Sequence, residues 1–275
     1  MTNKLSGEAY AKRQDASRPL SGDSFTFPDT GEAGESFVQL PFQPLGISRL
    51  GDTIYVANYF DPSFMMAEVS FERGLPCLNN IRHVRGTLPR REIRMFPDVC
   101  QPVGANRMQA VIPYSHDHLG LTRNEDNQIF NIRLQKDGAW QHESATYLKQ
   151  GGRGGDPITS IKHTRDGFVT IEIDGKGECW LRDYRNELFA EEQIPTNRYG
   201  LDILDDGTIV TIADYRAKEH GIFFGKECRT PGFYGNGIAC LPNGGALTTL
   251  YGGSVPSPFG GIPGELQYIP PELLK

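Results

Sequence analysis

The sequence has little of what marks several common protein classes. Its five cysteines form no Cys-x-x-Cys pair and are odd in number, which favours buried thiols over a disulfide framework or a zinc ribbon. No stretch approaches the roughly 18 uninterrupted apolar residues of a transmembrane helix. The N-terminus also lacks the apolar core of a signal peptide. We therefore expect a cytoplasmic protein that does not interact with membranes.

Positive charge is also scarce. There are 28 Lys and Arg residues against 34 Asp and Glu, which gives a formal net charge of −6. A nucleic-acid-binding domain usually carries a basic face, so nucleic acid is not an expected partner. The glycine run at 151–155 lacks the Lys-Ser/Thr ending of a phosphate loop and precedes a strand pattern, so no nucleotide cofactor is expected.

What the chain does contain is turns and short strands. Its 32 glycines and 19 prolines exceed the usual shares, and long helical periodicity is missing. One pattern recurs: a glycine or aspartate, a short strand, an Asp-Gly or Asn-Gly turn, and a second strand that ends in a polar or aromatic group. Its copies lie at 46–59, 156–174, 200–215 and 235–251, with a degenerate copy at 107–114.

Further strand candidates follow each hairpin. Four short strands per unit at a period of about 40 residues are typical of a β-propeller blade. We predict an all-β fold with a polar N-terminal arm over 1–35 and a single propeller over 36–275. Five blades are favoured, and a sixth fits if the long second unit is divided. A β-sandwich is the alternative, although it would not repeat the same hairpin.

The chain ends suggest how the ring closes. Residues 265–269 read as the third strand of the last unit, and residues 37–40 supply its fourth. A last blade shared by both termini leaves no exposed sheet edge at the junction.

The repeated hairpins resemble those of the NHL and SMP-30/gluconolactonase class of β-propellers. The segment Asn236-Gly-Ile-Ala resembles the one with which gluconolactonase-type proteins supply a metal-ligand asparagine. The resemblance implies a propeller fold and assigns Asn236 as a metal ligand. A matching acidic segment near the start of the chain is missing.

In a propeller, the loops before the first strands and after the second strands gather at one face, around the central channel. Here these loops are rich in tyrosine, histidine, aspartate and arginine, whereas the opposite turns are not. We expect a small-molecule site at this face. Its predicted substrate-binding residues are Tyr59, Tyr114, Arg198, Tyr215, Arg216 and Tyr251, with the arginines suited to an anionic group.

Four residues are candidates for acid–base catalysis. His116 and His118 lie two residues apart, so on an extended strand both share one face, although two solvated loop histidines fit the pattern too. Asp214 and Glu172 end second strands and could converge across the channel. Asp214 and Asp174, with Asn236, are alternatively ligands of one divalent cation such as calcium, magnesium or zinc, or simply cap turns. The other histidines, including His220, are expected to be structural.

Two functions remain open from these patterns. One is an enzyme that hydrolyses, isomerises or eliminates on a small polar or aromatic molecule. The other is a non-catalytic binding module, lectin-like or a protein-interaction scaffold. Because the loops share tyrosine but differ in their charged members, a single asymmetric site and hence the enzyme is favoured.

Overall fold

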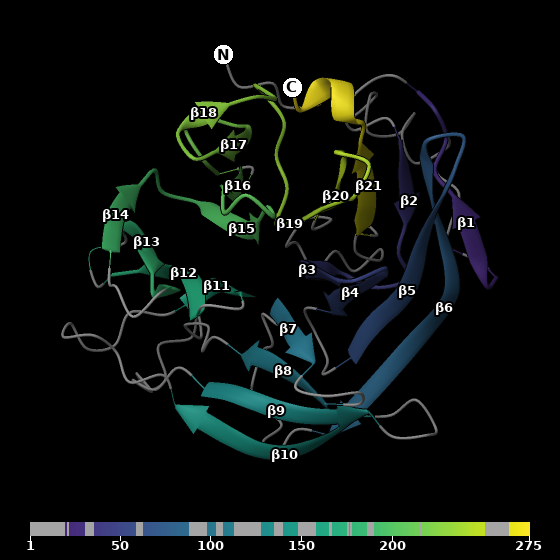
Figure 1. Ribbon diagram of the computed structural model, residues 1–275, viewed down its shortest axis with the longest axis horizontal. Coiled ribbons are helices and arrows are strands. Elements are labelled where there is room, and N and C mark those ends of the chain that lie inside the picture. Colours follow the sequence, from purple (N-terminus) through teal and green to yellow (C-terminus); the bar gives the residue numbers. More distant parts are fainter. Residues whose placement is uncertain are drawn as a thin grey trace, which may run out of the picture.

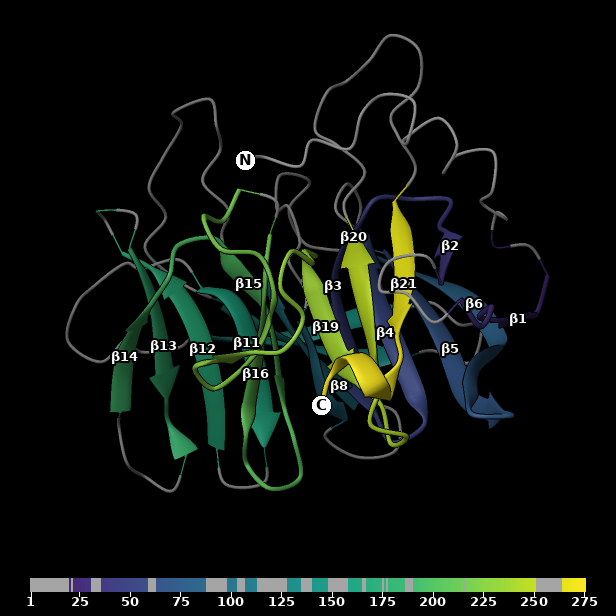
Figure 2. The ribbon, with the colours of Figure 1, turned by 90° about the horizontal axis from the view of Figure 1, so that it is seen from above.

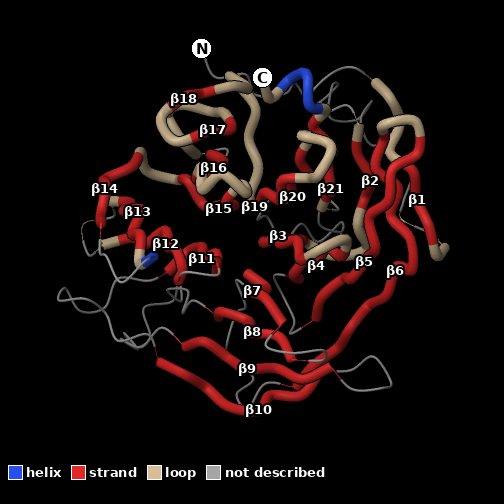
Figure 3. Tube along the Cα trace, viewed as in Figure 1, coloured by secondary structure: helices blue, strands red, loops and turns tan. Residues whose placement is uncertain are grey.

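In the computed structural model, the described part of the chain has an all-β fold (Figure 3). The structure describes residues 20, 22–30, 36–58, 63–87, 98–102, 107–112, 128–134, 140–147, 158–164, 167–174, 176, 178–185, 190–214, 216–250 and 264–275. For strands between 98 and 147, and for a few other strand positions, only the backbone is described. Within this part of the chain, no helix has the length and apolar character needed to span a bilayer.

The strands fall into five consecutive four-stranded antiparallel units. Unit one is β3 (Pro44–Leu50), β4 (Thr53–Asn58), β5 (Ser63–Glu72) and β6 (Leu75–Thr87). Unit two is β7 (Asp98–Pro102), β8 (Arg107–Ile112), β9 (Gln128–Leu134) and β10 (Trp140–Tyr147). Unit three is β11 (Ile158–Thr164), β12 (Gly167–Ile173), β13 (Cys179–Asp183) and β14 (Ala190–Ile194).

Unit four is β15 (Arg198–Ile203), β16 (Ile209–Ala213), β17 (Ile222–Phe224) and β18 (Glu227–Cys228). Unit five is β19 (Gly237–Cys240), β20 (Ala246–Leu250), β21 (Glu265–Ile269) and, from the other end of the chain, β2 (Phe37–Gln39). The predicted pairing of 37–40 with 265–269 is therefore present, with Phe37 opposite Gln267. A 3₁₀ turn over Pro271–Leu273 ends the chain.

The units are arranged around a common centre, with their first strands innermost (Figure 1). Each of β3, β7, β11 and β15 contacts the first strand of the next unit, and β19 contacts both β15 and β3. Units one and two are also joined at their outer strands, where β10 pairs with β6 in parallel through Trp140 and Gln141. This pairing makes one nine-stranded sheet, which also includes β1 (Ser24–Thr26), beside three four-stranded sheets.

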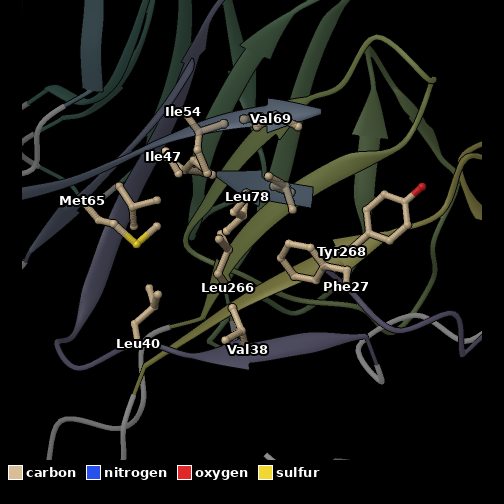
Figure 4. Packing of buried hydrophobic residues seen from close by; sticks show 14 of the residues in the cluster. Phe27, Val38, Leu40, Ile47, Ile54, Met65, Val69, Leu78, Leu266 and Tyr268 are labelled. Carbon is tan, nitrogen blue, oxygen red and sulfur yellow. The ribbon is translucent and has the colours of Figure 1, made fainter. Parts of the chain in front are cut away.

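Part of the segment that the sequence analysis assigns to a polar arm is packed. Strand β1 pairs with β6, and Phe27 is fully buried in the core between units five and one. In Figure 4 its ring lies beside Tyr268, with Val38 and Leu266 close by. Two phenylalanines in an otherwise polar stretch give no periodic pattern, so this contact depends on a partner strand about 50 residues away.

The inner strands come close enough to require glycine. A Cβ on Gly200 in β15 would lie 3.0 Å from the Cα of Gly237 in β19 and would overlap Ile212. The turns between first and second strands also follow the prediction: in unit four, Gly207 has φ +86° and Asp206 accepts a hydrogen bond from the Thr208 N–H. These turns make the hairpins, and the inner glycines let neighbouring units meet.

A buried carboxylate links three units near the centre. Asp202 of β15 is 3% exposed and forms an ion pair with Lys162 of β11 at 2.7 Å. Its other oxygen accepts a 2.7 Å hydrogen bond from the Cys240 N–H of β19. The Cys240 carbonyl in turn accepts a 2.7 Å bond from Nε of Arg49 in β3. Four of the five inner strands are thus joined by side chains.

Replacing Asp202 with Asn should therefore destabilise the fold, because the Lys162 ammonium would lose its anionic partner in a mostly buried place. We expect a loss of about 3 kcal/mol in the free energy of unfolding, measured by urea denaturation. The exposed turn residue Asp205 provides the matched control, and Asp205→Asn should change stability by less than about 0.5 kcal/mol. Equal midpoints for the two variants would contradict this role for Asp202.

Candidate functional site

The predicted site corresponds to one end of the sheets, which we call the upper face: the end where each first strand begins and each second strand ends. In Figure 2, β20 ends at this side and the C-terminal 3₁₀ turn lies at the other. Asp174, Asp214, Arg216 and Asn236 are at strand ends on the upper face. The remaining predicted residues on these loops lie outside the described residues: Tyr59, Tyr114, His116, His118, Tyr215 and Tyr251.

Asp214 and Arg216 form a close ion pair at the end of β16. The carboxylate of Asp214 is completely buried, and one of its oxygens accepts hydrogen bonds from Nε and Nη2 of Arg216 at 2.8 and 2.7 Å. The other oxygen accepts the Arg216 backbone N–H at 2.7 Å. The Arg216 side chain is 51% exposed. A buried anion therefore fixes the orientation of a guanidinium that solvent reaches.

The same tripeptide produces the same local geometry elsewhere. Asp183 and Arg185 flank Tyr184 as Asp214 and Arg216 flank Tyr215, and Asp183 accepts the Arg185 backbone N–H and its guanidinium. That pair lies at the lower end of β13, where Arg185 also donates to the Gly207 carbonyl and its side chain is 20% exposed. The hydrogen-bonded fork is thus a local property of Asp-Tyr-Arg, and exposure distinguishes Arg216.

Arg198, the second predicted arginine, is buried. It is 6% exposed and its guanidinium carbon lies 3.5 Å from the centre of the Phe223 ring in β17. Its Nε has no hydrogen-bond partner. Burial lowers the pKa of this guanidinium, and the nearby acids Glu219 and Glu192 raise it by less. The structure does not place Arg198 on the exposed surface beside Arg216.

The carboxylates of the two predicted aspartate ligands of a metal are already engaged. Asp174 accepts the backbone N–H groups of Lys176 and Glu178 and the Trp180 indole, and these hydrogen bonds hold its pKa below the usual value. Asn236 donates its backbone N–H to the Thr249 carbonyl, which fixes the backbone at this position. Asp214 faces a guanidinium, which repels a cation. Among the described residues no group of three or more His, Cys, Asp and Glu side chains could hold a metal. This donor set does not fit a divalent cation.

Glu172, a predicted catalytic residue, belongs to a buried network inside unit three. Its carboxylate is hydrogen-bonded to Arg182, accepts the Thr170 hydroxyl at 2.6 Å, and accepts the Tyr184 hydroxyl at 3.3 Å. Both Glu172 and Arg182 are less than 5% exposed. The Tyr184 ring also stacks on Phe168. The structure gives Glu172 a role in joining β12 to β13.

One aromatic pair at the upper face was not anticipated. His220 precedes β17 and Tyr234 precedes β19, and their ring centres are 5.5 Å apart. The two loops are tied together because the Gly232 N–H donates to the His220 carbonyl. From the sequence, His220 is expected to be a structural or surface residue, since its nearest polar neighbours in sequence form no motif. The recurrence of tyrosine before and after inner strands is the signal that points to this pair.

Comparisons with known proteins identify no family. No family model and no curated protein matches the chain. Among solved structures, the N-terminal domain of Nup159 aligns with 92% of this chain and 65% of that chain, at 10% identity and a TM-score of 0.26. The WD40 domain of SCAP from fission yeast aligns with 86% and 63%, at 11% identity and a TM-score of 0.25.

The chain thus spans slightly less than two thirds of each solved structure. Both are β-propeller domains, and the resemblance to them is weak. At such TM-scores it carries no argument, so the sheets are identified as blade-like from their own strand pairing. The resemblance to the NHL and gluconolactonase class stays a prediction.

The Glu172 network predicts how stability depends on pH. Burial and the Glu172 anion raise the pKa of Tyr184 from its ordinary 10.0 to about 12. A pKa raised in the folded state gives stability that is complete below pH 10 and is lost as the pH rises through about 12. Urea unfolding at pH 9 and pH 11 should therefore show a smaller loss for Tyr184→Phe than for the wild type. Equal losses for both proteins would contradict this assignment.

Proposed function

We propose that the five units are the blades of one closed five-bladed β-propeller. The contacts of β19 with both β15 and β3 support a closed ring of inner strands. The β2–β21 pairing supports closure by strands from opposite ends of the propeller sequence, because β2 covers the outer edge of β21. The five antiparallel four-stranded units favour five blades over six.

We further propose that the upper face binds a small molecule that carries a carboxylate or phosphate group. The observation that carries this proposal is Arg216, a half-exposed guanidinium held rigidly by the buried Asp214. Guanidinium groups bind such anions through paired hydrogen bonds, and an arginine fixed in advance loses less conformational entropy on binding. The His220–Tyr234 pair offers aromatic surface on the same face.

Catalysis in this proposal rests on His116 and His118. They follow β8, the second strand of unit two, as Asp214 and Arg216 follow the second strand of unit four. Because both pairs of residues follow second strands in the sequence, we propose that the histidines act on the molecule held by Arg216. Imidazole is the usual acid–base group at neutral pH, and hydrolysis, isomerisation and elimination all require such a group.

Asp214 and Glu172 are weaker candidates for proton transfer, because each is already hydrogen-bonded to an arginine. A divalent cation at Asp214 is disfavoured for the same reason. The described part of the site thus supports anion binding at Arg216 and disfavours a metal at the Asp214 carboxylate. The second candidate function, a binding module, uses the same Arg216 contact and has no turnover.

The role of Arg216 is tested by ligand binding. Saturation-transfer NMR with a panel of small aliphatic and aromatic carboxylates and phosphate monoesters identifies a ligand of the wild type. Arg216→Met should weaken its binding at least about tenfold, which corresponds to about 1.4 kcal/mol. Arg185→Met is the matched control, because it breaks the same fork at the opposite end, and it should bind as the wild type does. Equal binding by Arg216→Met would remove the basis of the proposal.

The histidines are tested by turnover. The wild type is assayed with lactones, aryl esters and the ligands found by NMR, and His116→Ala and His118→Ala are compared on any substrate that reacts. Loss of about 100-fold in kcat with the fold retained is expected for at least one variant. Arg216-dependent binding without turnover on any substrate would favour the binding module.

A further inference from the structure

A second site, distinct from the upper-face arginine, is indicated by the buried charge of Arg198. Arginine stays protonated at neutral pH, so this side chain carries a full positive charge into the interior. A buried charge normally has an anionic partner, because removing it from water otherwise costs several kcal/mol. Arg198 is 6% exposed and has no such partner within 4 Å among the residues that the structure describes.

The nearest acids do not fill this role. Glu192 and Glu219 act on Arg198 only through space, and both are exposed. Glu192 forms an ion pair with Lys226 at 2.9 Å. The carboxylate of Asp214 is taken by Arg216. Each acid near Arg198 is therefore in solvent or paired with another cation.

Two polar atoms on the same side of unit four lack hydrogen bonds. They are Nε of Arg198 and the hydroxyl oxygen of Thr211, both buried. Thr211 is the cross-strand partner of Phe223, and the guanidinium carbon of Arg198 lies over the Phe223 ring. Both groups can donate a hydrogen bond. Two unpaired donors beside a buried cation require an acceptor that carries negative charge.

The walls of this position are apolar. Phe223 and Ala213 are at most 1% exposed and belong to one small cluster, with Cys228 packed against it. The thiol of Cys179 in unit three accepts hydrogen bonds from the backbone N–H groups of Asn197 and Arg198, and burial raises the pKa of that thiol, so it is not the missing anion. Such surroundings suit a small anion that sheds its water.

We propose that a small monovalent inorganic anion, with chloride as the probe, binds between units three and four and is held by Nε of Arg198 and the hydroxyl of Thr211. The anion neutralises the buried guanidinium and satisfies both donors. It joins the upper part of unit four to unit three and is a structural ligand, separate from the molecule proposed to bind at Arg216.

The test is thermal unfolding in sodium chloride and in sodium gluconate at equal ionic strength. A bound anion stabilises the folded state, so the wild-type midpoint should rise by about 2 to 4 °C for each tenfold increase in chloride above the dissociation constant, with no such rise in gluconate. Arg198→Met keeps a long apolar side chain against Phe223 without the charge. This variant should show no difference between the two salts.

Arg229→Met is the matched control. Arg229 also lies over a phenylalanine, with its guanidinium carbon 4.2 Å from the centre of the Phe224 ring, but it is paired with Glu227 and the Leu274 carbonyl. Its loss should leave the chloride effect at the wild-type size. A chloride effect of equal size in the wild type and Arg198→Met would be a general salt effect and would overturn the proposal.

A direct measurement keeps the proposal testable if Arg198→Met does not fold. Crystals of the wild-type protein grown in bromide should show an anomalous peak beside Nε of Arg198 and the Thr211 hydroxyl. A water molecule at that position, with no anomalous signal, would overturn the proposal. Thr211→Val removes one donor and keeps the side-chain shape. This variant should need about a tenfold higher chloride concentration for the same rise in the unfolding midpoint.

Discussion

The carboxylate of Asp202 is the buried contact that joins units three, four and five to one another. Among the described residues, the first strands of neighbouring units form no common ladder. Backbone links between units include the β6–β10 pairing and a hydrogen bond from the Gly235 N–H to the Ala213 carbonyl. Apolar contacts between the sheets are not directional, so by themselves they do not fix how one sheet is placed against the next. Asp202, with Lys162 on one side and the Cys240 N–H on the other, fixes three sheets in one register relative to each other. The upper-face loops are positioned by strands that this contact aligns.

Two copies of Asp-Tyr-Arg show how far a local sequence determines a site. Both make the same fork. An aspartate at a strand end accepts the backbone N–H of the arginine two residues later, and this turn brings the guanidinium back to the aspartate carboxylate. Their surroundings decide the rest. Arg185 joins units three and four through its hydrogen bond to the Gly207 carbonyl, whereas Arg216 is half exposed at the predicted site. Geometry follows from the tripeptide, whereas function depends on the end of the strand at which it lies.

The same distinction explains what could be predicted from the sequence. Hairpins with Asp-Gly or Asn-Gly turns are local, and those over 158–173, 198–213 and 237–250 appear where the sequence indicates. The pairing of β2 with β21 is long-range but was predictable, because the last unit lacks a strand. The parallel contact of β10 with β6 and the burial of Phe27 have no local pattern. Partners of charged residues were the hardest to predict. In the sequence, Glu172 and Arg198 cannot be told apart from surface residues, and only the packing of the strands shows that they are buried.

The contribution of β2 to the last sheet also constrains how the chain is made. Phe37 is synthesised long before its partner Gln267, because the two lie far apart in the sequence. Until Gln267 is made, β2 has no neighbour in its own sheet. Val38 of β2 then lacks Leu266 and Tyr268, with which it packs in the folded core. Contacts between residues so distant in sequence form slowly. Unit five therefore cannot be completed before β21 has been synthesised, and a nascent chain released before that point would carry β2 as an unpaired strand.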